Sequence, residues 1–165
     1  PGHNLHEFSG FTLSVCQLRP ESRGYVHLRS AAAVEKPIIQ PNYLEADLDQ
    51  QTMVDGLKVS RQIMDQPAIA KFVRREVEPG PDCSSDGALL EYVRASGTTI
   101  FHPSGTCKMG SDPQAVVDDR LRVHGIEGLR VADASIMPTV ASSNTNAVCI
   151  MIGEKVSDMI LADAT

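Results

Sequence analysis

The side chain with the clearest capacity for chemistry in this sequence is His102. A histidine is the side chain best suited to accept a proton near neutral pH. Pro103 follows it and favours an extended backbone at His102, which fixes the direction of the imidazole. The next residues, Ser104-Gly105-Thr106, are small and leave room for a ligand or another backbone segment. His102 is therefore a candidate general base. The alternative is a buried histidine hydrogen-bonded to a backbone carbonyl.

A second candidate site is the run Ser142-Ser143-Asn144-Thr145-Asn146-Ala147, at the start of a predicted helix. Helix N-termini favour Asn and Ser, so Asn144 can be an N-cap and nothing more. The free N–H groups and the dipole of such a terminus also stabilise negative charge. The run can therefore hold an anionic or electron-rich ligand, and both interpretations stay open.

The four cysteines, Cys16, Cys83, Cys107 and Cys149, argue against structural zinc. Zinc sites normally bring cysteines in pairs about two to four residues apart, and no two of these are so spaced. Three of the four lie in apolar or strand-like stretches, where a free thiol packs as a small hydrophobic group. We expect buried free thiols, which favours a reducing compartment. Cys107 lies near His102 in sequence, but Cys–His nucleophile pairs are usually assembled from distant parts of a chain.

The strands that would position these residues are short. Alternating side chains predict strands over 11–18 and 25–29, joined as an antiparallel pair by the turn at 20–24. Apolar and β-branched runs predict strands over 98–101 and 129–133 and a short hairpin over 115–124. Pro37 and Pro41 leave a short extended piece between them.

Helical periodicity and capping residues predict three helices. They cover residues 48–65 with Asp47 as N-cap, about 86–97 after the capping run Ser84-Ser85-Asp86, and 145–162 with Asn144 as N-cap. A further helical turn or two follows Pro67. Together with the strands, these helices predict an α+β fold in which helices cover an antiparallel sheet.

Composition and charge exclude several classes of protein. The 15 basic and 21 acidic residues give a formal net charge of −6, the wrong sign for binding nucleic acid. No apolar run approaches the roughly 20 residues of a transmembrane helix, and no signal segment opens the chain. Glycine-rich phosphate-binding loops are absent. The sequence starts at Pro1 and continues like the interior of a protein, so we expect either a trimmed terminus or a part of a longer chain.

Ordered motifs run along the whole sequence. The early ones are Ser9-Gly10-Phe11, Arg19-Pro20-Glu21-Ser22-Arg23-Gly24 and Pro41-Asn42-Tyr43-Leu44. The later ones are His102-Pro103-Ser104-Gly105-Thr106-Cys107-Lys108-Met109-Gly110, Asp112-Pro113, Val117-Asp118, Leu121-Arg122-Val123-His124-Gly125, Gly128-Leu129-Arg130-Val131-Ala132-Asp133-Ala134-Ser135-Ile136-Met137-Pro138 and the Asn144 helix. Together these motifs resemble the C-terminal portion of the glucose-methanol-choline (GMC) flavoprotein oxidoreductases, and above all the choline dehydrogenase-like alcohol dehydrogenases.

The resemblance implies roles for the two candidate sites. In this family a histidine at the position of His102 acts as general base towards an alcohol hydroxyl, and hydride leaves carbon for flavin N5. Asn144 stands where the family has His or Asn. Since an amide cannot titrate, Asn144 would orient or hydrogen-bond the substrate oxygen.

The resemblance also implies an FAD site. Asp133 and Ala134 match the end of a strand that approaches FAD mainly through backbone groups. Asn146 and Ala147 match positions beside the flavin pyrimidine edge, where the helix dipole would stabilise the negative charge of the reduced flavin. No residues are expected to bind a metal.

The same resemblance divides the chain into a substrate-binding part, 1–127, and a segment 128–165 that returns into the FAD-binding part. The family's N-terminal dinucleotide fingerprint is missing from this sequence. We therefore expect FAD binding to need the N-terminal FAD-binding half of the same protein. The expected substrate is a small primary alcohol such as choline. The expected location is the cytoplasm, with membrane association of the full-length protein as the alternative.

Two other functions stay open. The family includes lyases that bind FAD and cleave cyanohydrins without redox chemistry. The chain could also be a folded, non-catalytic fragment, which would expose an apolar face where the FAD-binding half should pack.

Overall fold

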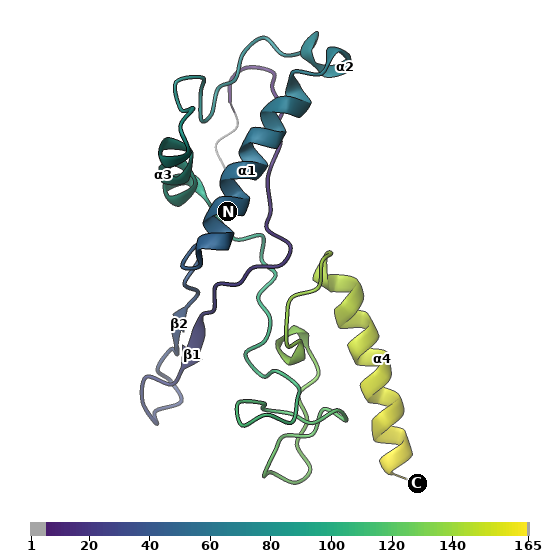
Figure 1. Cartoon of the computed structure of the whole chain (residues 1–165). Helices are drawn as coiled ribbons and strands as arrows, with labels where there is room; N and C mark the ends of the chain where they lie inside the picture. Colours follow the sequence, from purple (N-terminus) through teal and green to yellow (C-terminus); the bar gives the residue numbers. More distant parts are fainter. Residues whose placement is uncertain (1–5, 165) are drawn as a thin grey trace. The chain divides into compact units, whose positions relative to one another are not determined.

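The computed structural model describes residues 6–164 (Figure 1). Its elements, in chain order, are the strands β1 (Tyr25–His27) and β2 (Ile38–Gln40), the helices α1 (Asp47–Met64), α2 (Pro67–Ala70) and α3 (Asp86–Ser96), the 3-10 turn η1 (Ala134–Ile136) and the helix α4 (Thr145–Asp163). The two strands and four α-helices found among the described residues confirm the predicted α+β class.

The described chain divides into two compact units. The first unit comprises the residues up to Gln17 together with 50–97, and the second comprises 18–49 together with the residues from Thr98 onward. Helix α1 therefore begins in the second unit and continues through the first. All the candidate site residues belong to the second unit.

The helices of the first unit follow local signals in the sequence. The side chain of Ser85 caps α3 by accepting a hydrogen bond from the Ala88 N–H at 3.2 Å, and the Gly97 N–H closes the helix on the Val93 carbonyl. Helix α2 starts at Pro67, as predicted. Asp47, expected as the N-cap of α1, is instead the first residue of that helix.

Polar side chains connect α1 to the rest of the first unit. Lys58 on α1 forms an ion pair with Asp86 on α3 at 2.8 Å, and the hydrogen bond to Asp86 raises the pKa of Lys58. Arg61 binds both carboxylate oxygens of Glu76 and also donates to the Gly80 carbonyl. The buried apolar residues on the helices of this unit are Val54, Leu89 and Val93.

The sheet of the second unit differs from the predicted hairpin. Strand β1 pairs in antiparallel fashion with β2, with Val26 opposite Ile39. The prediction of a strand over 11–18 paired with 25–29 is wrong, because residues 11–18 form no strand. Alternating apolar and polar side chains indicate a preference for an extended backbone, but they do not determine which strand a segment pairs with. The proline-bounded piece 38–40 supplies the partner instead.

A buried carboxylate holds the turn that precedes β1. Asp49 is 3% exposed, and its two oxygens accept the backbone N–H groups of Glu21 and Ser22, each at 2.8 Å. The Ser22 hydroxyl accepts the Ala46 N–H at 3.0 Å. A Cβ at Gly24 would overlap the Gln40 carbonyl, so only glycine fits there. The 20–24 turn is thus fixed against the segment that enters α1.

The core of the second unit lies between η1 and α4. Its buried members come from the loop 117–121, from the end of η1 and from the inner face of α4: Val117, Leu121, Ile136, Met137, Ile152 and Val156. Helix α4 confirms the predicted helix over 145–162 and extends it by one residue. The loop itself turns through an antiparallel bridge between Val117 and Val123, the centre of the predicted hairpin.

Two predicted strands in the second unit are wrong. Residues 129–133 contribute a single bridge, between Arg122 and Arg130. Residues 98–101 form no strand, and Phe101 has φ 63°, in the left-handed region that an aromatic residue rarely adopts. A residue with that φ interrupts an extended backbone. The apolar pattern of residues 98–101 does not indicate such a φ.

The C-terminal end of α4 is held by two arginines. Asp163 accepts from Arg120 at 2.6 Å and also from Arg130, whose guanidinium reaches the Arg120 carbonyl as well. Burial of Asp163 opposes its ionisation, but the hydrogen bonds and charges of Arg130 and Arg120 outweigh this and lower the pKa of Asp163. This cluster joins the end of α4 to the 118–130 loop.

We expect Asp49→Asn to destabilise the protein by about 1–3 kcal/mol, because an amide can accept only one of the two buried N–H groups. Asp47→Asn, an exposed position in the same first turn of α1, is the matched control. Urea unfolding followed by circular dichroism measures both. Equal unfolding midpoints for the two variants would contradict the role assigned to Asp49.

Asp163→Asn should lower the unfolding temperature at pH 7 and do so less at pH 3. A carboxylate with a lowered pKa stabilises the folded state above its ordinary pKa, and this contribution is lost as the pH falls. Thermal unfolding at both pH values measures the effect, with exposed Asp158→Asn on the same helix as the control. A difference that does not depend on pH would refute the pairing of Asp163 with the two arginines.

Candidate active site

His102 lies directly after the left-handed residue Phe101, whose N–H is held by the Thr99 hydroxyl at 3.0 Å. The imidazole is half-buried, and its Nδ1 atom is buried with no hydrogen-bond partner among the described residues. The alternative from the sequence, a histidine bonded to a backbone carbonyl, is therefore not what the described residues show. A buried polar atom without a partner is rare, and a catalytic role is one of the explanations for it.

The segment after His102 is attached to η1 by backbone hydrogen bonds. The Cys107 N–H donates to the Ser135 carbonyl at 3.0 Å, and the Met109 N–H donates to the Ile136 carbonyl at 2.8 Å. Gly105, with φ 86°, allows the chain to turn close to the Met137 carbonyl. The two longest motifs in the sequence therefore run side by side, which their separation in sequence does not reveal.

Asp133 and Ala134 lie at the start of η1. The Asp133 carboxylate caps this turn by accepting the Ser135 N–H at 2.7 Å. Asp133 is exposed and Ala134 is half-buried against the apolar core. The predicted cofactor residues at this position thus sit on a turn that is locked both by its own cap and by the 102–110 segment.

Asn144 is the N-cap of α4, as the sequence predicts. Its Oδ1 accepts the N–H of Asn146 at 2.9 Å. This bond assigns the orientation of the amide, because the oxygen must face the helix and the Nδ2 amino group must face away from it. Asn144, Asn146 and Ala147 are exposed, whereas Thr145 between them is buried. The first turn of α4 contains no acidic residue, so its positive dipole end is not neutralised from within.

The apolar core connects these parts. Helix α4 packs on η1 through Ile136, Ile152 and Val156. Since η1 also carries the 102–110 segment, the six predicted site residues depend on one continuous support. No hydrogen bond joins His102 to Asn144 within the part of the chain that the structure describes. Each side chain therefore has a polar atom left to form a hydrogen bond with a ligand.

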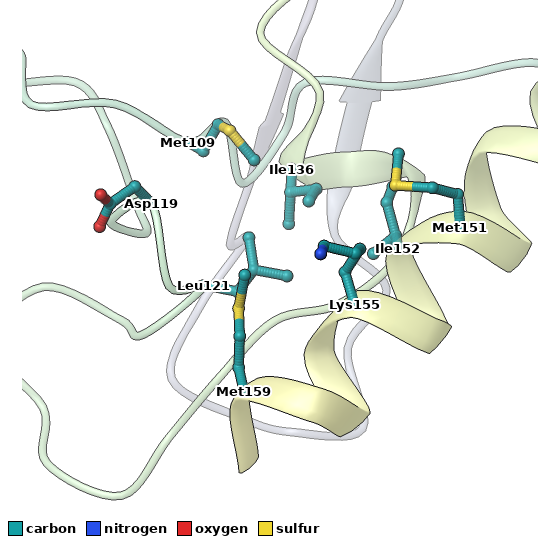
Figure 2. A pocket seen from close by; sticks show the side chains of 8 residues that line it. All are labelled: Met109, Asp119, Leu121, Ile136, Met151, Ile152, Lys155 and Met159. Carbon is teal, nitrogen blue, oxygen red and sulfur yellow. The ribbon is translucent and has the colours of Figure 1, made fainter. Parts of the chain in front are cut away.

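An apolar cavity lies beside this core, away from the predicted residues. Figure 2 shows Met151, Ile152, Lys155 and Met159 of α4 around it, facing Leu121 and Ile136. Its volume is about 160 Å³, and Met109 and Asp119 complete the lining. None of the six predicted site residues lines the cavity, so we do not assign it to the active site.

Residues 6–164 offer neither a metal-binding cluster nor a membrane-spanning helix. Those residues contain no group of three or more His, Cys, Asp or Glu side chains that could hold a metal ion. Their helices include none that is long and apolar enough to cross a membrane. The four cysteines are free thiols; Cys16 is exposed and the other three are half-buried.

Solved structures resemble the chain over most of its length. A formate oxidase from Aspergillus oryzae RIB40, studied for the modification of its FAD, matches with a TM-score of 0.83 and 35% identity, over 88% of this chain and 26% of that one. A pyridoxine 4-oxidase from Mesorbium loti matches with a TM-score of 0.80 and 35% identity, over 86% of this chain and 28% of that one.

Curated relatives match more closely in sequence. An oxygen-dependent choline dehydrogenase from Cronobacter sakazakii is 50% identical over 159 residues, which is 96% of this chain and 28% of the relative. An alcohol dehydrogenase (acceptor) from Pseudomonas putida is 47% identical over 92% of this chain and 28% of the relative. The chain thus spans little more than a quarter of the length of these relatives.

The family model of the C-terminal GMC oxidoreductase domain matches residues 20–153, which include all six predicted site residues. The resemblance found in the sequence motifs is therefore confirmed. The chain belongs to the GMC oxidoreductase family.

Proposed function

We propose that this chain carries the general base and the substrate-orienting amide of an FAD-dependent oxidoreductase that acts on a primary alcohol, with choline as the first candidate. The observation that carries the proposal is the bond from the Asn146 N–H to the Asn144 side-chain oxygen at 2.9 Å. It turns Oδ1 towards the helix and leaves the Nδ2 amino group of Asn144 to meet a substrate. That group donates hydrogen bonds and cannot accept a proton. Proton acceptance therefore falls to His102.

The proton leaves the alcohol hydroxyl for the Nε2 atom of His102 as the O–H bond breaks. Because the Nδ1 atom of His102 is buried, Nε2 is the nitrogen that faces a substrate. Asn144 donates from Nδ2 to the same oxygen and stabilises the negative charge that develops there. FAD, when bound, supplies the hydride acceptor that turns the alcohol carbon into a carbonyl carbon.

The start of α4 suits an electron-rich flavin edge. Asn146 and Ala147 are exposed there, Ala147 is small, and no acidic side chain of the first turn competes for the helix dipole. Asp133 and Ala134 would approach the cofactor through their backbone, because the Asp133 carboxylate is occupied by the Ser135 N–H. We assign these four residues to FAD binding, and none to a metal.

The rest of the FAD site would come from the N-terminal half of the same protein. In this proposal residues 1–127 belong to the substrate-binding part and 128–165 return into the FAD-binding part. The many exposed apolar side chains, including Leu28, Val34, Phe72 and Leu161, support a larger protein that covers them.

The four free thiols support a reducing, cytoplasmic location, with the membrane surface as the alternative.

His102→Ala should slow flavin reduction by choline about 10²–10⁴-fold, the usual contribution of a general base. Flavin content should not change. Anaerobic stopped-flow absorbance of the full-length flavoprotein measures the rate, and His27→Ala, at an exposed position on β1, is the matched control. A normal rate of flavin reduction in the His102 variant would contradict the assigned role.

Cyanide release from a cyanohydrin, with no reduction of the flavin by any alcohol, would identify a lyase instead.

Two substitutions at Asn144 should separate capping from chemistry. Asn144→Asp keeps a good N-cap but loses the donor, so the unfolding temperature should hold while flavin reduction falls. Asn144→Ala loses both, so reduction should fall and stability should drop by about 1 kcal/mol. Stopped-flow reduction and thermal unfolding of both variants provide the comparison. Full activity of Asn144→Asp would show that the amide acts only as a cap.

A further inference from the structure

One side-chain hydrogen bond ties the approach to Asn144 to a distant part of the second unit. The Nε atom of Arg19 donates to the hydroxyl of Ser142 at 2.8 Å, across 123 positions of sequence. Ser142 stands two residues before Asn144. A guanidinium donor makes this a charge-assisted bond, which is stronger than a bond between neutral groups.

The segment that Arg19 holds has few other hydrogen bonds. Between η1 and α4, the residues 138–143 accept or donate no backbone hydrogen bond within the described part of the chain. The Ser143 hydroxyl reaches only the carbonyl of the adjacent Asn144, at 3.5 Å. Ala141 packs on the apolar core, and the bond from Arg19 is the one hydrogen bond that ties these described residues to a distant segment.

The backbone of Arg19 is held in place by the turn that follows it. It immediately precedes the 20–24 turn, whose N–H groups at Glu21 and Ser22 are held by buried Asp49. Arg23 closes the same turn by donating to the Pro20 carbonyl at 2.7 Å. The position of the Arg19 backbone is thus set independently of α4.

Helix stability does not explain this arrangement. The N-terminus of a helix carries partial positive charge, so a cation beside it is electrostatically unfavourable. The helix dipole therefore does not account for the exposed Arg19 near the start of α4. Its bond to Ser142 offers a positional role, because displacing a catalytic amide by about 1 Å can cost on the order of 100-fold in rate.

We propose that Arg19 is a positioning residue for the Asn144 amide and acts through Ser142. The inference rests on the proposed function, since it concerns the orientation of Asn144 towards the alcohol oxygen. Arg19 fixes Ser142, Ser142 fixes the entry into the N-cap, and the N-cap directs the Nδ2 group. Arg19 itself does not touch the substrate.

The test uses steady-state kinetics of the full-length flavoprotein with choline. Arg19→Met and Ser142→Ala should each lower kcat about 10–100-fold while KM changes less than about threefold, because a misdirected donor weakens the transition state more than substrate binding. Ser142→Thr keeps the hydroxyl and should restore kcat. Ser157→Ala, at an exposed position further along α4, is the matched control and should stay within about twofold. Unfolding temperatures should match the wild type.

A double-mutant cycle identifies the route. In an Asn144→Ala background, Arg19→Met and Ser142→Ala should have no further effect on kcat, because the group they position is gone. Additive losses, a kcat unchanged by either single substitution, or losses that follow a lower unfolding temperature would each overturn the inference. A wild-type protein whose flavin no alcohol reduces would overturn the proposed function together with it. An active wild type with silent variants would overturn this inference alone.

Discussion

The packing of α4 on η1 is the contact on which the rest of the site depends. Ile136 and Met137 at the end of η1 meet Ile152 and Val156 of α4 in the buried cluster. The backbone bonds of Cys107 and Met109 to η1 then carry the His102 segment on the same support. A few apolar side chains thereby set the geometry of polar groups that come from three separate stretches of sequence. A substitution that shortens one of these buried side chains would therefore disturb the positions of both candidate catalytic residues.

This support is small compared with the apolar surface that the chain leaves open. Val34 is 94% exposed and Leu28 84% exposed, and both strands of the sheet are exposed at every residue. Two-stranded sheets are marginal by themselves and need a covering surface. In the larger protein that we propose, that surface would come from the rest of the chain. The polar anchors, such as Asp49 under the 20–24 turn, then matter because the apolar core alone gives little restraint.

Local signals in the sequence predicted the helices well, and the strands poorly. Ser85, Pro67 and Asn144 act within one helical turn, so their effects can be read from neighbouring residues. Strands depend on partners: residues 11–18 have the alternation of a strand, but they belong to no sheet in the described part of the chain. The candidate site also contains some features that the local sequence predicts and others that it does not. Asn144 was identified by type and place, whereas the bond of Arg19 to Ser142 joins residues 123 positions apart and the left-handed φ of Phe101 is not indicated by its residue type.

The use of asparagine at position 144 follows from the two demands placed on that residue. A cap must accept an N–H of the first turn, while an oxygen that loses its proton is best met by a donor. The amide holds an acceptor and a donor at different corners of one planar group, so satisfying the Asn146 N–H with Oδ1 also directs Nδ2 outward. A carboxylate would satisfy only the first demand. Helix capping and substrate orientation are therefore coupled in a single group, and whatever sets the path of the chain into the cap also sets the direction of the donor.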